Sequence, residues 1–151
     1  MKRLAGYHDT MSGAMQGRSS PVAERLQRAM NAHDIDAFID CFHDDYDSRQ
    51  PAHPDRAFRG SAQARSNWTA IFEGVPDFTA ELVSSAVNGD TEYSEWHWRG
   101  THSDGTPLDM AGVIVCGVRE GRMSWARLYV EPVEQAGAGI EAAVKQIAGD
   151  D

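Results

Sequence analysis

Three β-rich segments joined by two short turns occupy residues 91–132 and constrain the fold of this chain more than any other feature. We expect strands at Thr91–Thr101, Leu108–Arg119 and Arg122–Val130. The turns between them contain Asp104-Gly105 and Glu120-Gly121, and glycine accepts the positive φ angle that tight hairpin turns need. A meander of this length after a helical first half indicates an α+β domain, in which one curved antiparallel sheet wraps around helices.

Apolar side chains at helical spacing predict three helices in the first half of the chain. The stripes are Val22, Leu26, Ala29 and Met30, then Ile35, Phe38, Ile39 and Phe42, then Ala64, Trp68, Ile71 and Phe72. Ser20, Asp34 and Ser61 precede these stripes, and each is a residue type that caps helix N-termini. We therefore expect a helical hairpin at Pro21–Phe42 and a third helix at Ala62–Phe72, packed inside the concave face of the sheet.

Two further strands and a loop complete the expected domain. Tyr46–Gln50 and Asp77–Val87 have strand composition, whereas Pro51 and Pro54 favour an irregular loop through Arg59. We expect one cone domain at residues 20–133, with a flexible N-terminal tail at residues 1–19. Residues 134–151 form a C-terminal tail, in which Ile140, Ala143, Val144 and Ile147 predict a short amphipathic helix.

Composition narrows the classes of partner and the compartment. The 14 basic and 23 acidic residues give a net charge of −9, which disfavours nucleic acid and anionic membrane as partners. No stretch approaches the ~20 consecutive apolar residues of a membrane span. Cys41 and Cys116 are expected to be buried free thiols rather than a disulfide, because two cysteines hardly make a secreted scaffold. These features predict a cytoplasmic protein.

The chain contains four short motifs: Asn31-Ala32-His33-Asp34-Ile35-Asp36, Phe42-His43-Asp44-Asp45, Gly60 and Gly121-Arg122-Met123. Together they resemble the nuclear transport factor 2-like superfamily, which contains ketosteroid isomerase, limonene-type epoxide hydrolases and the SnoaL-like polyketide cyclases. The segment Gly100-Thr101-His102, followed by Asp104-Gly105-Thr106-Pro107, is most similar to the SnoaL-like branch. The resemblance covers about residues 20–133 and implies a cone-shaped fold with a cavity inside.

The catalytic residues of two better-known branches have no counterpart here. Placed on this chain by the matched motifs, the base, the tyrosine and the second acid of ketosteroid isomerase fall at Gln50, Leu26 and near Ile114. The acid of the epoxide hydrolases falls at Leu128. The resemblance therefore implies the fold without the chemistry of either enzyme.

Strand alternation indicates which side chains face the cavity. Trp96, Trp98 and His102 share one face of their strand, and Leu128 shares an inward face with Ala126 and Val130. We expect the substrate-binding residues to be Gln50, Trp68, Phe72, Trp96, Trp98, Met110 and Leu128. The opposite face of the last strand carries Trp125, Arg127 and Tyr129, and we expect it to pair two chains as a homodimer.

His102 and Tyr46 are the first candidates for catalysis, because a histidine can exchange a proton and a tyrosine hydroxyl can donate to an oxyanion. The alternatives are that His102 caps its turn and that Tyr46 is a core aromatic. Glu131 and His53 are the second pair of candidates. Glu131 either pairs with Arg127 on the outer face or turns to the cavity mouth through a bulge. His53 lies in a loop that either covers one end of the cone or is simply exposed.

The chain lacks a pair of metal ligands at a suitable spacing, a glycine-rich phosphate loop and a nucleophile motif, so we expect no metal and no cofactor. The first hypothesis is an acid–base enzyme that cyclises or isomerises a hydrophobic, oxygenated small molecule of polyketide-like character, with epoxide opening as one route. The second is a non-catalytic, dimeric module that binds a small molecule. The third is a structural dimer subunit.

Overall fold

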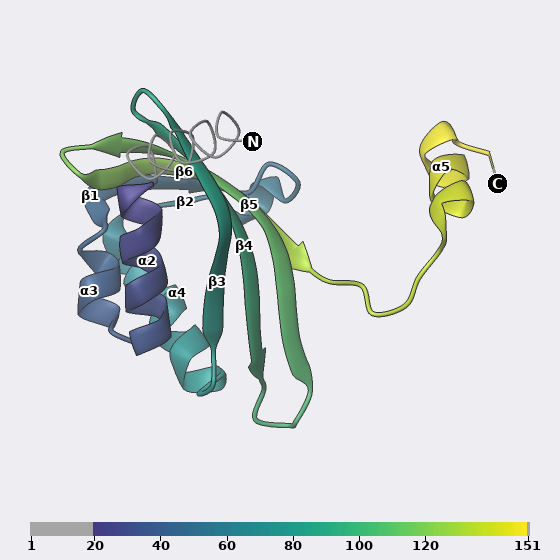
Figure 1. Ribbon diagram of the computed structural model, residues 1–151, viewed down its shortest axis with the longest axis horizontal. Helices are drawn as coiled ribbons and strands as arrows, with labels where there is room; N and C mark the ends of the chain where they lie inside the picture. Colours follow the sequence, from purple (N-terminus) through teal and green to yellow (C-terminus); the bar gives the residue numbers. More distant parts are fainter. Residues whose placement is uncertain (1–19, 151) are drawn as a thin grey trace, which may run out of the picture.

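The structure, a computed structural model, describes residues 20–150 of the chain; the predicted N-terminal tail at residues 1–19 lies outside them. Helices α2 and α3 come first, and a short helix α5 ends the chain (Figure 1). The elements in order are α2 (Pro21–Ala32), α3 (Ile35–Ile39), β1 (Phe42–Arg49), the 3-10 turn η1 (Pro54–Arg56), β2 (Phe58–Arg59), α4 (Ser61–Gly74), β3 (Thr79–Asn88), β4 (Thr91–Thr101), β5 (Pro107–Arg119), β6 (Arg122–Pro132) and α5 (Ile140–Ala148).

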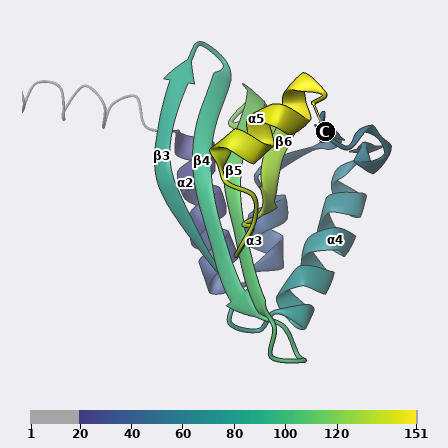
Figure 2. The same cartoon turned by 90° about the vertical axis from the view of Figure 1, so that its right-hand side faces the viewer.

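The strands form one six-stranded sheet in the order β2-β1-β6-β5-β4-β3. All neighbours pair antiparallel except β1 and β6, which run parallel. Figures 1 and 2 show the sheet bending around α2, α3 and α4, so that the three helices fill its concave side. The expected α+β cone is confirmed.

Helix α2 begins differently from the sequence prediction. Ser20 makes no capping bond with its side chain; its hydroxyl donates to the carbonyl of Ala86 instead, at 3.4 Å. The buried carboxylate of Glu92, on β4, accepts the backbone N–H of Ala23 at 3.3 Å. A negative charge is favourable at a helix N-terminus, where N–H groups lack partners inside the helix. The strand therefore caps the helix, which fixes α2 across the sheet.

Side chains of α2 also cover the free edge of the sheet. Asn31 accepts the N–H of Ala80 at 2.7 Å and donates to its carbonyl at 3.0 Å. Gln27 accepts the N–H of Leu82. Because an edge strand presents unpaired backbone groups, these bonds protect β3 from pairing with another chain.

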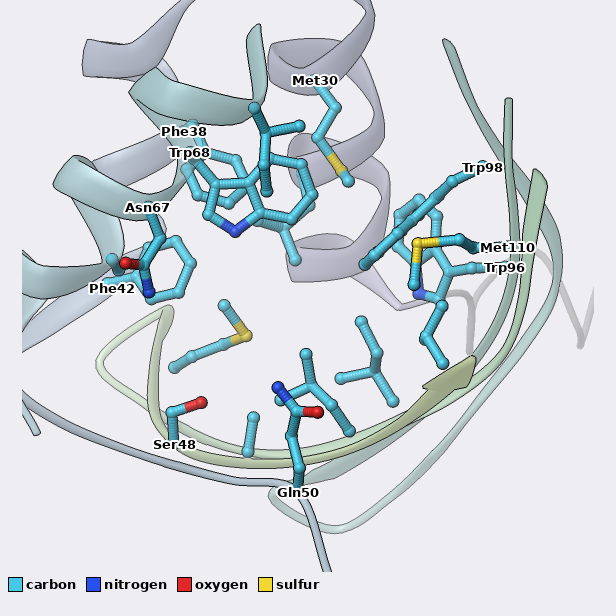
Figure 3. Close-up of a pocket in the computed structure, with 18 of the residues that line it drawn as sticks. Met30, Phe38, Phe42, Ser48, Gln50, Asn67, Trp68, Trp96, Trp98 and Met110 are labelled. Atoms are coloured by element: carbon cyan, nitrogen blue, oxygen red, sulfur yellow. The ribbon is translucent and has the colours of Figure 1, made fainter. Parts of the chain in front are cut away.

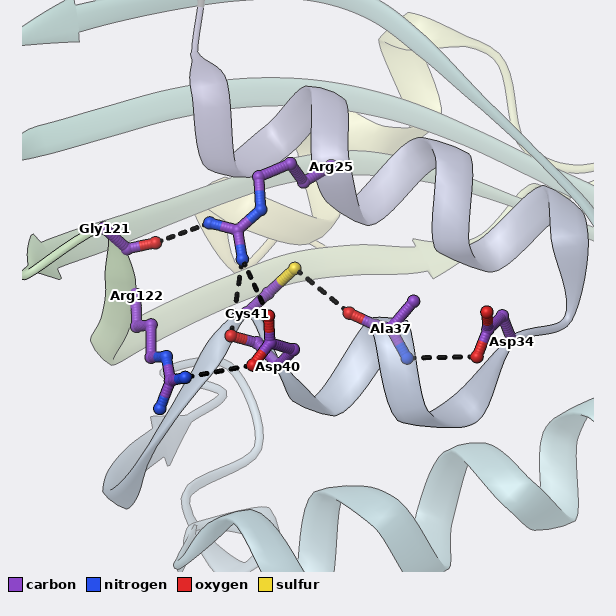
Figure 4. A network of polar contacts seen from close by, with 7 residues as sticks. All are labelled: Arg25, Asp34, Ala37, Asp40, Cys41, Gly121 and Arg122. Atoms are coloured by element: carbon purple, nitrogen blue, oxygen red, sulfur yellow. Dashed lines mark hydrogen bonds and ion pairs between the residues drawn. The ribbon is translucent and has the colours of Figure 1, made fainter.

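An ion-pair network ties the helical hairpin to the turn between β5 and β6 (Figure 4). Arg25 donates to the carbonyl of Gly121 at 2.7 Å and lies 3.6 Å from the carboxylate of Asp40. Arg122 donates to the same carboxylate at 3.0 Å. The turn itself has positive φ at Glu120 (56°) and Gly121 (75°), which is the backbone that the Glu-Gly sequence predicts.

Several predicted boundaries need correction. The strand expected at Tyr46–Gln50 is β1, which already starts at Phe42, and the helical hairpin expected to reach Phe42 ends at Ile39. The N-cap of α4 is Gly60, with φ 97°, so Ser61 is the first helical residue rather than the cap. The loop expected at residues 51–59 contains η1 and the two-residue strand β2, which pairs with β1. Asp34 caps α3 as predicted, accepting the N–H of Ala37 at 3.0 Å.

Cys41 and Cys116 are free and buried, as the composition predicts. Within residues 20–150, no helix is both long enough and apolar enough to cross a membrane. The predicted C-terminal helix is present as α5, and none of its residues is buried.

Candidate functional site

A cavity of about 290 Å³ lies between the concave face of the sheet and the helices. Its walls are mostly aromatic and aliphatic, which is typical of small-molecule sites. Figure 3 shows Ser48 and Gln50 with their polar ends toward the open centre. The lining residues are Leu26, Met30, Phe38, Phe42, Tyr46, Ser48, Gln50, Arg56, Phe58, Ala64, Asn67, Trp68, Ile71, Phe78, Trp96, Trp98, Leu108, Met110, Ile114, Met123, Ala126, Leu128 and Val130.

Two indole groups on β4 differ in their hydrogen bonding. Trp96 donates from Nε1 to the hydroxyl of Ser94 at 2.8 Å. Trp98 is 6% exposed, and its Nε1 is the buried side-chain donor that has no partner within the described residues. An unpaired buried donor is rare in proteins and calls for an explanation. The ring of Trp98 forms part of the cavity wall, whereas its Nε1 atom is itself shielded, so an oxygen atom of a bound molecule can supply the partner when the ring turns toward the open space.

Two amides bring further hydrogen-bonding capacity to the cavity. Asn67 on α4 accepts from Gln63 at 2.7 Å through its side-chain oxygen, so its NH₂ group is left to donate. Gln50 likewise accepts from Arg56 at 3.1 Å. In Figure 3 the indole nitrogen of Trp68 also points into the open centre. The lining is therefore apolar with several donors, which suits a hydrophobic molecule that carries oxygen atoms.

Tyr46 is buried in the cavity wall, 4% exposed, with its ring 4.8 Å from that of Phe42. Burial raises the pKa of its hydroxyl well above the usual range, against a smaller lowering by a hydrogen bond with Ser48. The phenol therefore stays protonated at neutral pH, and it can donate a hydrogen bond but cannot act as a base.

His53 and Glu131, which were predicted separately as catalytic, lie in contact. His53 Nε2 is 2.7 Å from Glu131 Oε1, across 78 residues of sequence. Neither side chain is among the residues that line the cavity. Glu131 follows the lining residue Val130 in an unbroken register with β5, so alternation turns its side chain toward the convex face, the first of the two positions expected for it. Because His53 lies between the lining residues Gln50 and Arg56, we call the two residues the rim pair; their role in catalysis stays a prediction.

The ion pair between Glu131 and Arg127, which the sequence offered as one possibility, does not form among the described residues. The guanidinium of Arg127 lies over the ring of Trp125 instead, 4.7 Å from its centroid. The loop after β1 bends across the end of β6, and this brings His53 within reach of Glu131.

His102 does not face the cavity, so its predicted position needs correction. It is exposed and lies one residue beyond β4, in the hairpin turn that leads to β5. Its backbone accepts from Gly105 at 2.9 Å and donates to Thr106 at 2.8 Å. Alternation along β4 does not extend past Thr101, because the chain turns there. This position fits the alternative role for His102, that of a residue in the turn.

Phe72 also departs from its expected place. It is not among the lining residues; its ring stacks on His33, with the centroids 4.9 Å apart and the planes 7° from parallel. The other predicted binding residues line the cavity, and their role in binding stays a prediction: Gln50, Trp68, Trp96, Trp98, Met110 and Leu128. Several lining residues were missed, among them Met30, Arg56, Phe58 and Met123. Of these four, only Met30 could have been indicated, by its place in the apolar stripe of the first helix.

Metal chemistry finds no support among the described residues. No group of three or more His, Cys, Asp or Glu side chains is placed to hold a metal ion in residues 20–150. His97 and Asp109 are adjacent at 2.5 Å, but on the convex face of the sheet. The hydrogen bond from His97 lowers the pKa of the Asp109 carboxyl, with a smaller contribution from Gln135.

Solved structures share this fold at low sequence identity. IdmH from Streptomyces antibioticus, a candidate polyketide cyclase, is 22% identical, with a TM-score of 0.64 over 73% of this chain and 89% of its own. A candidate polyketide cyclase from Sinorhizobium meliloti is 18% identical, with a TM-score of 0.58 over 74% and 94%. An LEH-like epoxide hydrolase from M. tuberculosis is 16% identical, with a TM-score of 0.63 over 73% and 80%.

No curated protein matches the chain. The model of the SnoaL-like domain matches residues 23–126. This range contains most of α2, strands β1 to β5, the first part of β6 and all but two of the residues that line the cavity. Because the match covers more than half of the chain, the chain belongs to the SnoaL-like domain family.

Proposed function

We propose that this protein binds a hydrophobic, oxygenated small molecule of polyketide-like character and catalyses its cyclisation or isomerisation by proton transfer. The observation that carries the proposal is the unpaired indole N–H of Trp98 in the wall of a largely apolar cavity. An unsatisfied buried donor costs about 1–3 kcal/mol. A ligand oxygen that accepts from this N–H removes that cost, so the site favours a ligand with a carbonyl, an enol or an epoxide.

The same donor suits a reaction in which charge develops on that oxygen. An N–H group fixed in an apolar, buried site stabilises a growing negative charge more strongly than water does. Tyr46 is a second donor in the cavity wall, since its raised pKa keeps it protonated. We assign to Trp98 and Tyr46 the binding of the reacting oxygen.

Proton transfer is assigned to the rim pair. If the Nε2–H of His53 donates to Glu131, Nδ1 keeps a lone pair and can accept a proton from a carbon or hydroxyl group of the ligand. The carboxylate of Glu131 then stabilises the imidazolium, as an acid does in a catalytic dyad. His53 returns the proton to another atom of the same molecule. The reaction rearranges bonds without net oxidation or reduction, so it needs no cofactor.

The rival function is a binding module without turnover. It is favoured by one specific observation: none of the described residues that line the cavity is Asp, Glu or His. A protein that only holds its ligand needs the apolar walls and the donors, and it has no use for the rim pair.

Tryptophan fluorescence tests binding first, because three of the four tryptophans line the cavity. A panel of aromatic and alicyclic ketones, enols and epoxides is titrated against the protein, and each hit is then incubated and followed by mass spectrometry and NMR for an isomer of equal mass. Binding with turnover supports an enzyme. Binding without turnover supports the rival function, and no binding across the panel contradicts both.

A matched pair of histidine variants locates the chemistry. His53→Gln should reduce turnover by about 10²–10⁴, the usual scale of proton-transfer catalysis, with little change in ligand affinity. His102→Gln makes the same replacement at an exposed turn outside the cavity and should leave turnover unchanged. Equal effects of the two variants would contradict the assignment of His53.

A further inference from the structure

One charged side chain stands in the otherwise uncharged wall of the cavity. Of the described residues that form this wall, Arg56 alone carries a charge at neutral pH. It belongs to η1 and is exposed, so it marks the part of the wall that meets solvent. The charge at this opening is therefore opposite in sign to the net charge of −9 of the chain.

No carboxylate in the described part of the chain neutralises Arg56 by an ion pair. The neighbouring arginines differ in this respect, since Arg49 and Arg59 both pair with Asp47, at 3.4 and 3.2 Å. Arg56 donates instead to a neutral oxygen, Oε1 of Gln50, at 3.1 Å. A guanidinium has several N–H donors, so most of those on Arg56 remain available to an anion.

The loop that carries Arg56 is restrained beside the cavity. The N–H of His53 donates to the carbonyl of Gln50 at 2.7 Å, and the N–H of Arg56 donates to the carbonyl of His53 at 3.0 Å. Pro51 and Pro54 fix φ at two further positions of the loop. These restraints keep Arg56 close to Gln50, so less conformational freedom is lost when the two side chains bind a ligand.

The side chain of Gln50 connects the guanidinium to the open space. Figure 3 shows its amide directed toward the centre of the cavity. Because the amide oxygen accepts from Arg56, its NH₂ group is left to donate. A guanidinium beside an NH₂ group offers donors to both oxygens of a carboxylate. Hydrogen bonds to an ionised acceptor are roughly twice as strong as those to a neutral one, so the pair favours an acid over a ketone or an ester.

We propose that the ligand of this cavity carries a carboxylate, which Arg56 and Gln50 bind at the opening while the hydrophobic body lies between the aromatic side chains. The inference rests on the proposed function and adds a substrate class to it. A charged group is costly to bury in apolar walls, so the carboxylate stays at the opening and the opposite end of the molecule enters the interior. A phosphate group carries more charge and would call for further cations, which the described lining does not offer.

Two probes that differ only in charge test the carboxylate site by isothermal titration calorimetry. 6-Acetyl-2-naphthoic acid and its methyl ester share a ring system and a ketone, and only the acid is ionised at neutral pH. We expect the natural chain to bind the acid roughly five- to tenfold more tightly than the ester. Added salt should weaken the binding of the acid and leave that of the ester unchanged, because salt screens an exposed ion pair.

Variants of two arginines locate the effect. Arg56→Gln should lower the affinity for the acid to that for the ester and leave the affinity for the ester unchanged. Arg59→Gln is the matched control, since it removes the same charge from a nearby side chain that pairs with Asp47 and lies outside the lining. It should change neither affinity. Arg56→Lys keeps the charge without the planar fork of donors and should retain part of the preference. Circular dichroism checks that each variant keeps its fold.

The outcomes separate this inference from the proposed function. Equal binding of acid and ester by the natural chain, or equal effects of Arg56→Gln and Arg59→Gln, would overturn the carboxylate site and leave the proposed function standing. Selective binding of the acid through Arg56, without turnover of any acid tested, would support the carboxylate site and contradict catalysis. Binding of neither probe would overturn the carboxylate site together with the use of the cavity for such ligands.

Discussion

Trp96 and Trp98 stand on the same face of β4 with their ring centroids 6.5 Å apart, yet only one of them has a partner for its indole N–H. Trp96 donates to Ser94, whereas Trp98 has no partner among the described residues. Both rings are more than nine-tenths buried and both line the cavity. The pair therefore offers an internal comparison between a donor that serves the fold and a donor that is available to a ligand.

Trp96→Phe and Trp98→Phe remove the same atoms from neighbouring positions, so the two variants lose similar packing. They differ in that only Trp96 loses a hydrogen bond together with its N–H. We expect Trp96→Phe to be the more destabilising by about 1–2 kcal/mol, because only this change breaks a hydrogen bond. Urea denaturation followed by circular dichroism measures the difference. Trp98→Phe should instead reduce the affinity for an oxygenated ligand by about tenfold. If Trp98→Phe proves the more destabilising variant, its N–H has a structural partner after all.

The carboxylate of Glu92 predicts an unusual dependence of stability on pH. Burial raises the pKa of this carboxyl above its ordinary 4.5, and this effect exceeds the lowering by the hydrogen bonds from Ala23 and Val22. For an acid whose pKa is raised by folding, the unfolded chain ionises first as the pH rises. Glu92 therefore lowers the free energy of unfolding progressively from pH 4.5 upward to its raised pKa.

Glu92→Gln removes this titration and keeps one acceptor oxygen. The free energy of unfolding of the variant, relative to the natural chain, should rise as the pH increases above 4.5. The opposite trend would mean that the N-terminus of α2 holds the pKa of Glu92 below its ordinary value.

Gly112 lies where β5 approaches β6 too closely for any side chain. A methyl group at this position would lie 2.1 Å from the backbone oxygen of Tyr129 and 2.6 Å from the Cα of Val130. Backbone atoms cannot move aside, so Gly112→Ala should destabilise the fold by at least about 2 kcal/mol. Gly74→Ala, where a methyl group meets nothing within 4 Å, should change stability by less than about 1 kcal/mol. Similar effects of both changes on the melting temperature would contradict this reading.

The sequence predicted the fold well because the meander, the helical stripes and the turn glycines are local signals. Alternation along β4 also placed Trp96 and Trp98 in the cavity, since both lie within the strand. It failed at His102, one residue past the end of that strand. Phe72 was misplaced for another reason: it shares a helical stripe with Trp68, but its ring stacks on His33 at the end of α2.

The contacts that define the candidate site could not be predicted from short sequence patterns. His53 and Glu131 were each considered as candidates, but their contact spans 78 residues and depends on how the loop after β1 bends. Glu92 gave no sign that it would replace Ser20 as the partner of the first turn of α2, because that role depends on the packing of β4 against the helix. Pairings of this kind follow from the curvature of the sheet.

The two native cysteines should be unreactive in the folded protein. Burial raises the pKa of the Cys116 thiol to about 12, and it raises that of Cys41 as well. Since the thiolate is the reactive species, little of it exists at pH 8. Ellman's reagent should therefore release no colour from the native chain within minutes, and two equivalents after unfolding in guanidinium. Ile147→Cys places a thiol on the exposed helix α5 and gives the positive control, with one equivalent released rapidly. Rapid labelling of Cys41 or Cys116 in the native chain would mean that the core opens on that timescale.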